Sequence, residues 1–414
     1  MSLPLVENID LFLNDKPSVY ALRQNALSAL EKTGFPTKKT EAWKYTDVKS
    51  ILNTPFSVNR EEHHCHHDCD CHHHEESDSF IEIRFCDGKL HVEEYNLPAG
   101  ITITPLPIAL YENEYKAYIL KSFDLEKHPF AALNAYYLEQ GICITVESGK
   151  TITKPIHIKY KQNNCAKQQL NIHNILVLEK DAKLELLEEF IDTNNEQSYL
   201  LNVVNEIYLK ANSSLNHYKI QKGNISANHL ALNAVKQQKE SSYKQFYLSD
   251  GAKLSRQETL IDLLQEKSSA EIYSAYRAKT NCLTDITCNI NHLKEETFSN
   301  QYAKAVLEDN SSATFQGKIH IAPNAVKTSG HQLHKALYLN DNATLNCKPE
   351  LEIYADDVKC SHGSSCGELD KDQLFYLTSR GIDSATAKEL LINAHLEEIL
   401  AFIPNPQIKE LFFF

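Results

Sequence analysis

The sequence predicts a mainly β protein whose core is a β-helix, with helical segments before and after it. Between residues 141 and 362, short stretches alternate apolar and polar side chains; Leu184 and Leu186, for example, alternate with Lys183 and Glu185. An alternation with a period of two is typical of strands that bury one face. Polar corners rich in Asp, Asn, Gly and Ser separate these stretches.

The corners resemble one another, which indicates a repeating unit of structure. They are residues 181–184, 212–215, 251–254, 310–313 and 342–345. Counted from the second residue of each, the separations are 31, 39, 59 and 32 residues, so the repeat is irregular. Asn-Gly, the commonest hairpin dipeptide, is absent, and Asp-Gly occurs only at Asp87 and Asp250. Stacked coils of short strands therefore fit better than a β-sandwich, which remains the alternative.

Both ends of the chain have helical periodicity. Apolar residues at mixed three- and four-residue spacing predict helices over 3–13 and 19–30. Near the other end, Gly381 closes a helix over about 374–380, and Asp383 or Ser384 is a suitable N-cap for the next. That last helix has apolar residues at i, i+3, i+4 and i+7: Ala387, Leu390, Leu391 and Ala394.

The chain thus divides into an N-terminal helical or mixed domain (1–140), a β-helix core (141–366) and a C-terminal helical domain (367–414). Its 414 residues carry a formal net charge of -13, which argues against a nucleic acid as the main partner. The first residues lack the basic and apolar segments of a signal peptide, and charged residues interrupt every apolar run. We therefore expect a soluble, cytoplasmic protein without a membrane partner.

A tract rich in histidine and cysteine lies at 63–74, where twelve residues hold seven imidazoles and three thiols. All ten are ligands for transition metals. They are His63, His64, Cys65, His66, His67, Cys69, Cys71, His72, His73 and His74. One interpretation is metal buffering or delivery; the other, which we favour, is an inessential solvated loop that binds metals with low specificity, because no folded framework surrounds it.

A second pair of ligand residues is Cys360 and His362, which follow the acidic pair at 356–357. On a strand, residues two apart share a face with Cα atoms roughly 6–7 Å apart, so thiol and imidazole would lie side by side. The pair suits a soft metal, although spacing alone favours a buried cysteine beside a surface histidine. His331 and His334 are a weaker candidate pair. No phosphate-binding loop or nucleophile elbow is present, so we expect no catalytic activity and no ATP hydrolysis by this chain.

Four segments resemble the SufB/SufD family of iron–sulfur cluster assembly proteins. Residues 355–363 and 372–382 resemble its C-terminal motif, 41–47 its N-terminal motif, and 130–134 the segment leading into its core. The B-type paralogue has a His-Glu-Ala motif where this chain has Cys-Ser-His-Gly. The chain is therefore most similar to D-type subunits. The tract at 63–74 departs from the family pattern.

The resemblance implies a right-handed parallel β-helix between helical domains, acting as a scaffold with a SufB-type paralogue and the SufC ATPase. It implies a nascent iron–sulfur cluster at the interface of the two β-helix subunits, with His362 and Cys360 as candidate contacts, and none tightly bound by the isolated chain. It also implies that the ATPase docks on the C-terminal helices. The candidate docking residues are Leu374, Phe375, Arg380, Leu390 and Leu391.

Two other classes of function are compatible with parts of the sequence. A stand-alone metal-binding protein or metallochaperone would use the tract at 63–74. A β-helix can also be a polysaccharide lyase or hydrolase, but the single Trp and the missing signal peptide argue against that class. Whether the isolated chain forms a homodimer is left open.

Overall fold

The computed structural model describes most of the chain. The described residues are 3–7, 12, 15–58, 79–91, 97–112, 115–163, 165–192 and 196–412. Within them, no helix combines the length and the apolar character needed to cross a membrane. The tract at 63–74 lies outside the described residues.

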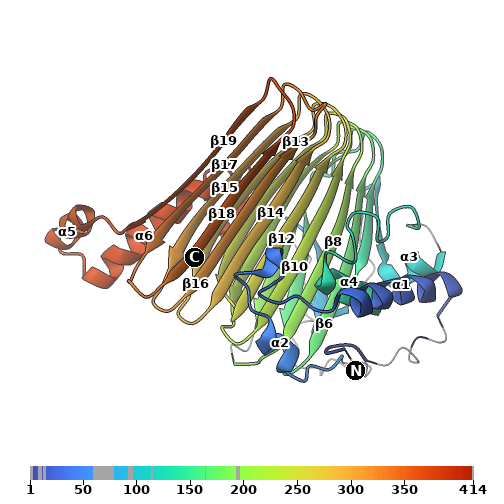
Figure 1. Ribbon diagram of the computed structural model, residues 1–414, viewed down its shortest axis with the longest axis horizontal. Helices are drawn as coiled ribbons and strands as arrows, with labels where there is room; N and C mark the ends of the chain where they lie inside the picture. The colour runs from blue at the N-terminus through green and yellow to red at the C-terminus, as the bar shows by residue number, and fades with distance from the viewer. Residues whose placement is uncertain are drawn as a thin grey trace.

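The core consists of two long β-sheets whose strands run side by side (Figure 1). Sheet I has ten strands: β1 (Ile81–Cys86), β2 (Lys89–Leu90), β5 (Ile156–Gln162), β7 (Lys183–Asp192), β9 (Ser214–Gly223), β11 (Ser242–Gly251), β13 (Ser269–Ala278), β15 (Phe298–Leu307), β17 (Ser329–Tyr338) and β19 (Lys359–Glu368). Sheet II has nine: β3 (Ile101–Pro105), β4 (Ile142–Val146), β6 (Gln169–Leu178), β8 (Leu200–Leu209), β10 (Asn228–Gln237), β12 (Leu254–Leu263), β14 (Leu283–His292), β16 (Ser312–Ile321) and β18 (Thr344–Ile353).

From β4 onward the chain alternates between the two sheets, and strands of the same sheet that lie one coil apart pair in parallel. This arrangement is a parallel β-solenoid, so the predicted β-helix is confirmed and the sandwich with antiparallel hairpins is excluded. The register between neighbouring strands is fixed by the stacking of their side chains. Side chains at equivalent positions in successive coils lie above one another at the strand spacing of about 4.8 Å. On the outer face of sheet I, the rings of Tyr218, Phe246 and Tyr273 stack with centroids 5.2 and 5.1 Å apart.

The corners explain the irregular spacing in the sequence. Residues in the left-handed conformation recur where sheet II passes to sheet I, 27 to 31 residues apart: Asp181, Asn212, Glu240, Lys267, Glu296, Lys327 and Asp357. A second series, Ala252, Asn281 and Asn310, lies where sheet I passes back to sheet II. The five corners recognised in the sequence mix both series, which is why their separations vary. Asn and Asp tolerate this conformation better than most residues.

Helices cover the outer faces of the two sheets. On sheet II, α1 (Pro17–Thr33) and α4 (Pro129–Tyr137) form one apolar cluster with strand residues such as Leu200 and Leu230. On sheet I, α6 (Ser384–Leu400) and α7 (Pro406–Leu411) pack on the aromatic stack through residues such as Leu396 and Ile408. Burying these faces removes apolar surface from water, which stabilises the solenoid.

The helices agree with the sequence patterns in part. The helix expected over 19–30 is α1, and Asp383 caps α6 by accepting hydrogen bonds from the amides of Ala385 and Thr386. Residues 3–7 form a turn instead of the start of a helix. The buried face of α6 consists of Ala387, Ile392, Leu396, Ile399 and Leu400, so the expected apolar stripe is rotated and Leu390 is exposed. The remaining helices are η2 (Glu41–Trp43), α2 (Lys49–Asn53), α3 (Leu106–Glu112) and α5 (Lys371–Ser379).

The two ends of the solenoid differ. At the N-terminal end, short antiparallel strands finish the sheets: β2 pairs with β1, and β3 pairs with β4. At the C-terminal end, β18 and β19 are the last strands of their sheets, and among the described residues nothing pairs with their outer edges (Figure 1). Such edges carry unused backbone donors and acceptors and are templates for pairing with another chain.

Candidate functional site at the open end

The last strand of sheet I places a row of polar and thiol side chains over the interior of the solenoid. In β17, every second residue from Gly330 to Ala336 is buried and faces inward. Strand β19 pairs with β17 in register, so the residues opposite these positions face the same way: Cys360, His362, Ser364 and Cys366. Cys360 and His362 therefore share a face, as the sequence predicts for residues two apart on a strand.

Exposure rises along the last three strands. Inward residues of β17 are buried, those of β18 are mostly half-buried, and in β19 His362 is exposed while Cys360 is half-buried. The cause is geometric, since the interior of each coil is covered by the next coil, and among the described residues no coil follows β18 and β19. The inward side chains of the last coil are thus accessible without any rearrangement of the fold.

Strand β18 supplies the facing half of this opening. Its register with β16 places its inward residues over the buried positions of that strand: Leu345, Cys347, Pro349, Leu351 and Ile353. We call these residues, together with Cys360, His362, Ser364 and Cys366, the open-end rim. The rim combines half-buried apolar side chains with three thiols and one imidazole.

Cys360 and His362 have different surroundings. Cys360 packs against the small apolar cluster of Ile319, Ile321 and Ala325, and partial burial raises the pKa of its thiol. His362 lies opposite Gln332, whose Nε2 donates to the carbonyl of Glu350 at 3.3 Å. The Oε1 of Gln332 is buried and accepts no hydrogen bond from the described residues.

The two other histidines considered in the sequence do not form a pair. His331 and His334 are three apart on β17 and point to opposite faces. His331 shares hydrogen bonds with the hydroxyls of Ser329 and Ser361, at 2.9 and 2.7 Å. His334 is buried against Phe315, with ring centroids 4.8 Å apart, and burial lowers the pKa of His334 to about 4.

No group of three or more His, Cys, Asp or Glu residues within the described part of the chain is arranged to hold a metal ion. The thiols and the imidazole of the rim therefore form no such group among themselves. The ten candidate ligands at 63–74 fall outside the described residues, and their role stays a prediction.

The candidate docking residues on the C-terminal helices are largely accessible. Phe375 on α5 is 72% exposed and Leu390 on α6 is 47% exposed, whereas Leu374 and Leu391 are half-buried. Arg380 is exposed, with its guanidinium 5.3 Å from the centroid of the Tyr376 ring. In Figure 1, α5 projects beyond the body of the solenoid. Exposed aromatic and aliphatic side chains on a projecting helix are typical of a protein interface.

Comparison with known proteins agrees with this architecture. The SufBD core domain of the SUF system for iron–sulfur cluster assembly matches residues 160–395, and the SufBD protein N-terminal region matches residues 8–158. The chain belongs to the SufBD family. Proteins of this family take part in iron–sulfur cluster assembly.

Several relatives of this SufBD protein match over nearly its whole length. It is 27% identical to the chloroplastic protein ABCI7 of Arabidopsis thaliana, over 99% of this chain and 88% of that protein. It is 29% identical to an iron–sulfur cluster assembly SufBD family protein of Synechocystis, over 94% of this chain and 88% of the relative. It is also 29% identical to the iron–sulfur cluster assembly protein SufD of Escherichia coli, over 94% of this chain and 90% of that protein.

The interior of this SufBD protein holds a charged network that sequence analysis missed. Glu188 on β7 is fully buried, and its carboxylate lies 3.2 Å from the Nζ of Lys219 and 2.7 Å from the Nε2 of His217, both on β9. Tyr160 and Asn205 donate to the same carboxylate, at 2.8 and 3.0 Å. Burial alone would raise the pKa of Glu188, but Lys219 and His217 hold it well below its ordinary value.

The alternation of apolar and polar residues along β7 already contained a signal for this network. Glu188 follows Leu184 and Leu186 at the inward positions of β7, so a charge at that position had to be paired in the interior. Burial lowers the pKa of Lys219, and Glu188 opposes that shift. The network fixes neighbouring coils against each other.

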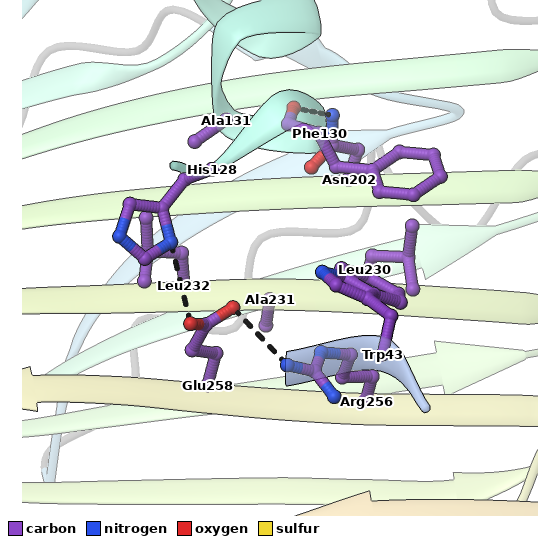
Figure 2. Close-up of a pocket in the computed structure, with 10 residues that line it drawn as sticks. All are labelled: Trp43, His128, Phe130, Ala131, Asn202, Leu230, Ala231, Leu232, Arg256 and Glu258. Atoms are coloured by element: carbon purple, nitrogen blue, oxygen red, sulfur yellow. Dashed lines mark hydrogen bonds and ion pairs between the residues drawn. The ribbon is translucent and has the colours of Figure 1, made fainter. Parts of the chain in front are cut away.

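A second buried ionic cluster joins the N-terminal segment to sheet II (Figure 2). The guanidinium of Arg256 on β12 lies 4.0 Å from the centroid of the Trp43 ring, and it forms ion pairs with Glu258, at 3.6 Å, and Asp285. His128 lies 3.3 Å from the Glu258 carboxylate. Burial raises the pKa of Glu258, but His128 and Arg256 together lower it to about 2.

The cavity between these residues is about 20 Å³, which is room for a water molecule but not for a substrate. We therefore interpret it as a structural junction. This junction accounts for the motif at 41–47. Trp43 of that segment packs on Arg256, and Thr46 donates a hydrogen bond to Asp285. The motif thus fixes the N-terminal region on the solenoid.

Proposed function

We propose that the chain is a non-catalytic scaffold subunit for iron–sulfur cluster assembly, acting with a SufB-type paralogue and the SufC ATPase. The observation that supports this proposal most directly is the open end of the solenoid, where no described residue pairs with the edge of either sheet and the inward side chains are accessible. The match to the SufBD family supports a paralogue as the partner.

A second β-solenoid is well suited to this end. Its strands would have the same spacing, so both sheets could continue across the junction by backbone hydrogen bonds. The junction would also bury the apolar part of the rim, including Leu345, Leu351 and Ile353, of which Ile353 is 41% exposed. Pairing would remove an exposed edge that otherwise favours aggregation.

The proposed interface between the two solenoids, which we call the seam, would enclose ligands for the nascent cluster, which is the cargo of the assembly. The Cys360 thiolate and the His362 imidazole are both ligands for iron, and the paralogue would supply the others. The SufC ATPase would dock on α5 and α6, and its motion would open or close the seam. The cytoplasm is the proposed compartment; cell fractionation tests it, since the Arabidopsis relative is named as chloroplastic.

The proposal is tested by co-expressing the chain with a SufB-type paralogue and SufC and measuring iron and sulfide in the purified complex. His362→Ala should lower the cluster content several-fold while the complex still forms. Because His362 is exposed in the free subunit, the variant should lose less than about 1 kcal/mol of stability. His331→Ala, an alteration on the outward face of the neighbouring strand, is the control. Normal cluster content in His362→Ala would remove this residue from the mechanism.

Pairing of the paralogue with the free edge of β19 is tested in the same co-expression system by removing one backbone hydrogen-bond donor. The backbone N–H of Lys359 donates to the carbonyl of Thr328, on the side of β17. Backbone N–H groups of successive residues in a strand point to opposite sides. Ser364 is five residues after Lys359, so its N–H points to the free edge of β19. Ser364→Pro removes that donor and should abolish co-purification of the paralogue, whereas Ser364→Ala should not. Equal recovery of the paralogue with both variants would show that it binds elsewhere.

The ATPase docking surface makes a separate prediction. Phe375→Glu and Leu390→Glu place a charge on exposed apolar side chains and should reduce SufC recovery in a pull-down at least tenfold. Lys180→Glu, a charge change at an exposed corner of the solenoid, should leave recovery unchanged. Circular dichroism should show an intact β-solenoid in all three variants. Full SufC recovery with both glutamate variants would place the docking surface elsewhere.

A further inference from the structure

Two of the rim thiols lie at one corner of the open end. Cys347 is the fourth residue of β18 and Cys366 the eighth of β19, and both face inward. The end of β19 lies beside the end of β17, where Tyr338 pairs with Glu368, and the chain passes from there directly into β18. Cys366 pairs with Ala336, which belongs to the same apolar cluster as Cys347. The strand order therefore places both thiols at the same end of the opening, facing its interior.

The electrostatics of Cys347 agree with this placement. Burial raises the pKa of its thiol, a hydrogen bond with Ser364 lowers it, and the electrostatic interaction with Cys366 raises it again. Cys366 is exposed and Cys347 is half-buried, so a cation can enter from solvent.

We propose that Cys347 and Cys366 form a two-thiolate site for a soft or borderline transition-metal cation such as Zn²⁺. Binding replaces the two thiol protons, which pass to solvent, with two metal–sulfur bonds. A hollow of about 460 Å³ lined by Cys366, Tyr338, Asp341 and Glu368 opens onto the corner. Because no third ligand among the described residues completes the set, the remaining coordination positions stay open to solvent or to an external thiol.

This site is distinct from the pair at Cys360 and His362. Four residues of extended strand separate His362 from Cys366, a distance of about 13 Å, and Cys360 lies at the opposite corner. One ion therefore cannot bind both pairs. The inference does not depend on the proposed scaffold function, because it concerns the free chain.

The test is cysteine alkylation of the full chain, followed by peptide mass spectrometry, with and without Zn²⁺ in a phosphine reductant. Zinc is added in excess over the seven histidines and three cysteines of the tract at 63–74. Zinc should slow alkylation of both Cys347 and Cys366 at least tenfold. In Cys366→Ser, the protection of Cys347 should disappear although its thiol remains, because a single thiolate lacks the chelate partner.

The control is Cys360→Ser, which removes another rim thiol and should leave the protection of Cys347 unchanged. Thermal melting should be similar for all three chains, since the rim is not part of the buried core. Zinc-independent alkylation of Cys347 and Cys366 would overturn the proposal, as would full protection of Cys347 in Cys366→Ser. Recovery of the two cysteines as a disulfide-linked peptide in the phosphine reductant would also overturn it.

Discussion

Lowering the pH from about 7.5 to about 5 should reduce the free energy of unfolding by several kcal/mol. Three fully buried histidines cause this loss, because burial lowers the pKa of His229 and of His292 to about 3 and that of His334 to about 4. In the unfolded chain they bind protons below about pH 6.5, whereas in the fold they stay neutral. Stability is thus lost as the pH falls from about 6.5 toward the folded pKa values.

The expected size of the effect is about 2 kcal/mol for each histidine at pH 5, since one pKa unit corresponds to about 1.4 kcal/mol. Neighbouring charges set the individual values: beyond burial, Lys219 lowers the pKa of His229 while Glu188 raises it, and His320 lowers that of His292. The buried carboxylates Glu188 and Glu258 have lowered pKa values, so their contribution is lost only below about pH 4.5.

Urea unfolding curves at the two pH values measure this effect. His334→Gln removes one buried titrating group, so the loss of stability between the two pH values should shrink by about 2 kcal/mol. His362→Gln alters an exposed imidazole of the rim and should leave the loss unchanged. If His334→Gln and the unaltered protein lose the same amount, protonation of His334 does not control the acid sensitivity.

Removing one member of the interior ion pair should destabilise the protein strongly. Glu188→Leu leaves the amine of Lys219 without its carboxylate partner in a site with no exposed surface, and we expect a loss of about 3–5 kcal/mol. The double variant Glu188→Leu/Lys219→Met removes both charges and should recover much of that loss. The recovery should be incomplete, because Tyr160 and Asn205 each lose a hydrogen bond to the carboxylate.

The same substitution at an exposed pair provides the control. Lys32 and Glu126 are 2.8 Å apart with side chains 67% and 47% exposed, and Glu126→Leu should cost less than about 1 kcal/mol. Equilibrium unfolding in urea measures all of these variants. A double variant as unstable as Glu188→Leu alone would mean that the lost hydrogen bonds, and not the unpaired charge, cause the damage.

The sequence by itself determined the local features of this protein. Period-two alternation such as that of Leu184 and Leu186 predicted strands, because the side chains of a strand alternate between its faces. Polar corners such as Asp181 and Asn212 are tolerant of the left-handed conformation that the structure has there. Asp383 was recognisable as an N-cap, and the motif at 355–363 predicted the SufBD family to which the chain belongs.

Only the tertiary structure decided which distant residues meet. Glu188 and Lys219 lie on neighbouring strands of sheet I, one coil apart, and their pairing depends on a register that the irregular corner spacing concealed. Cys347 and Cys366 lie at the same end of the opening because the corner after β17 starts β18 at the end where β19 finishes. A period of two in the sequence shows which side chains of a strand share a face. The stacking of the coils decides which side chains of other strands they contact. Each such contact joins two strands whose separation along the sequence depends on the lengths of the corners between them.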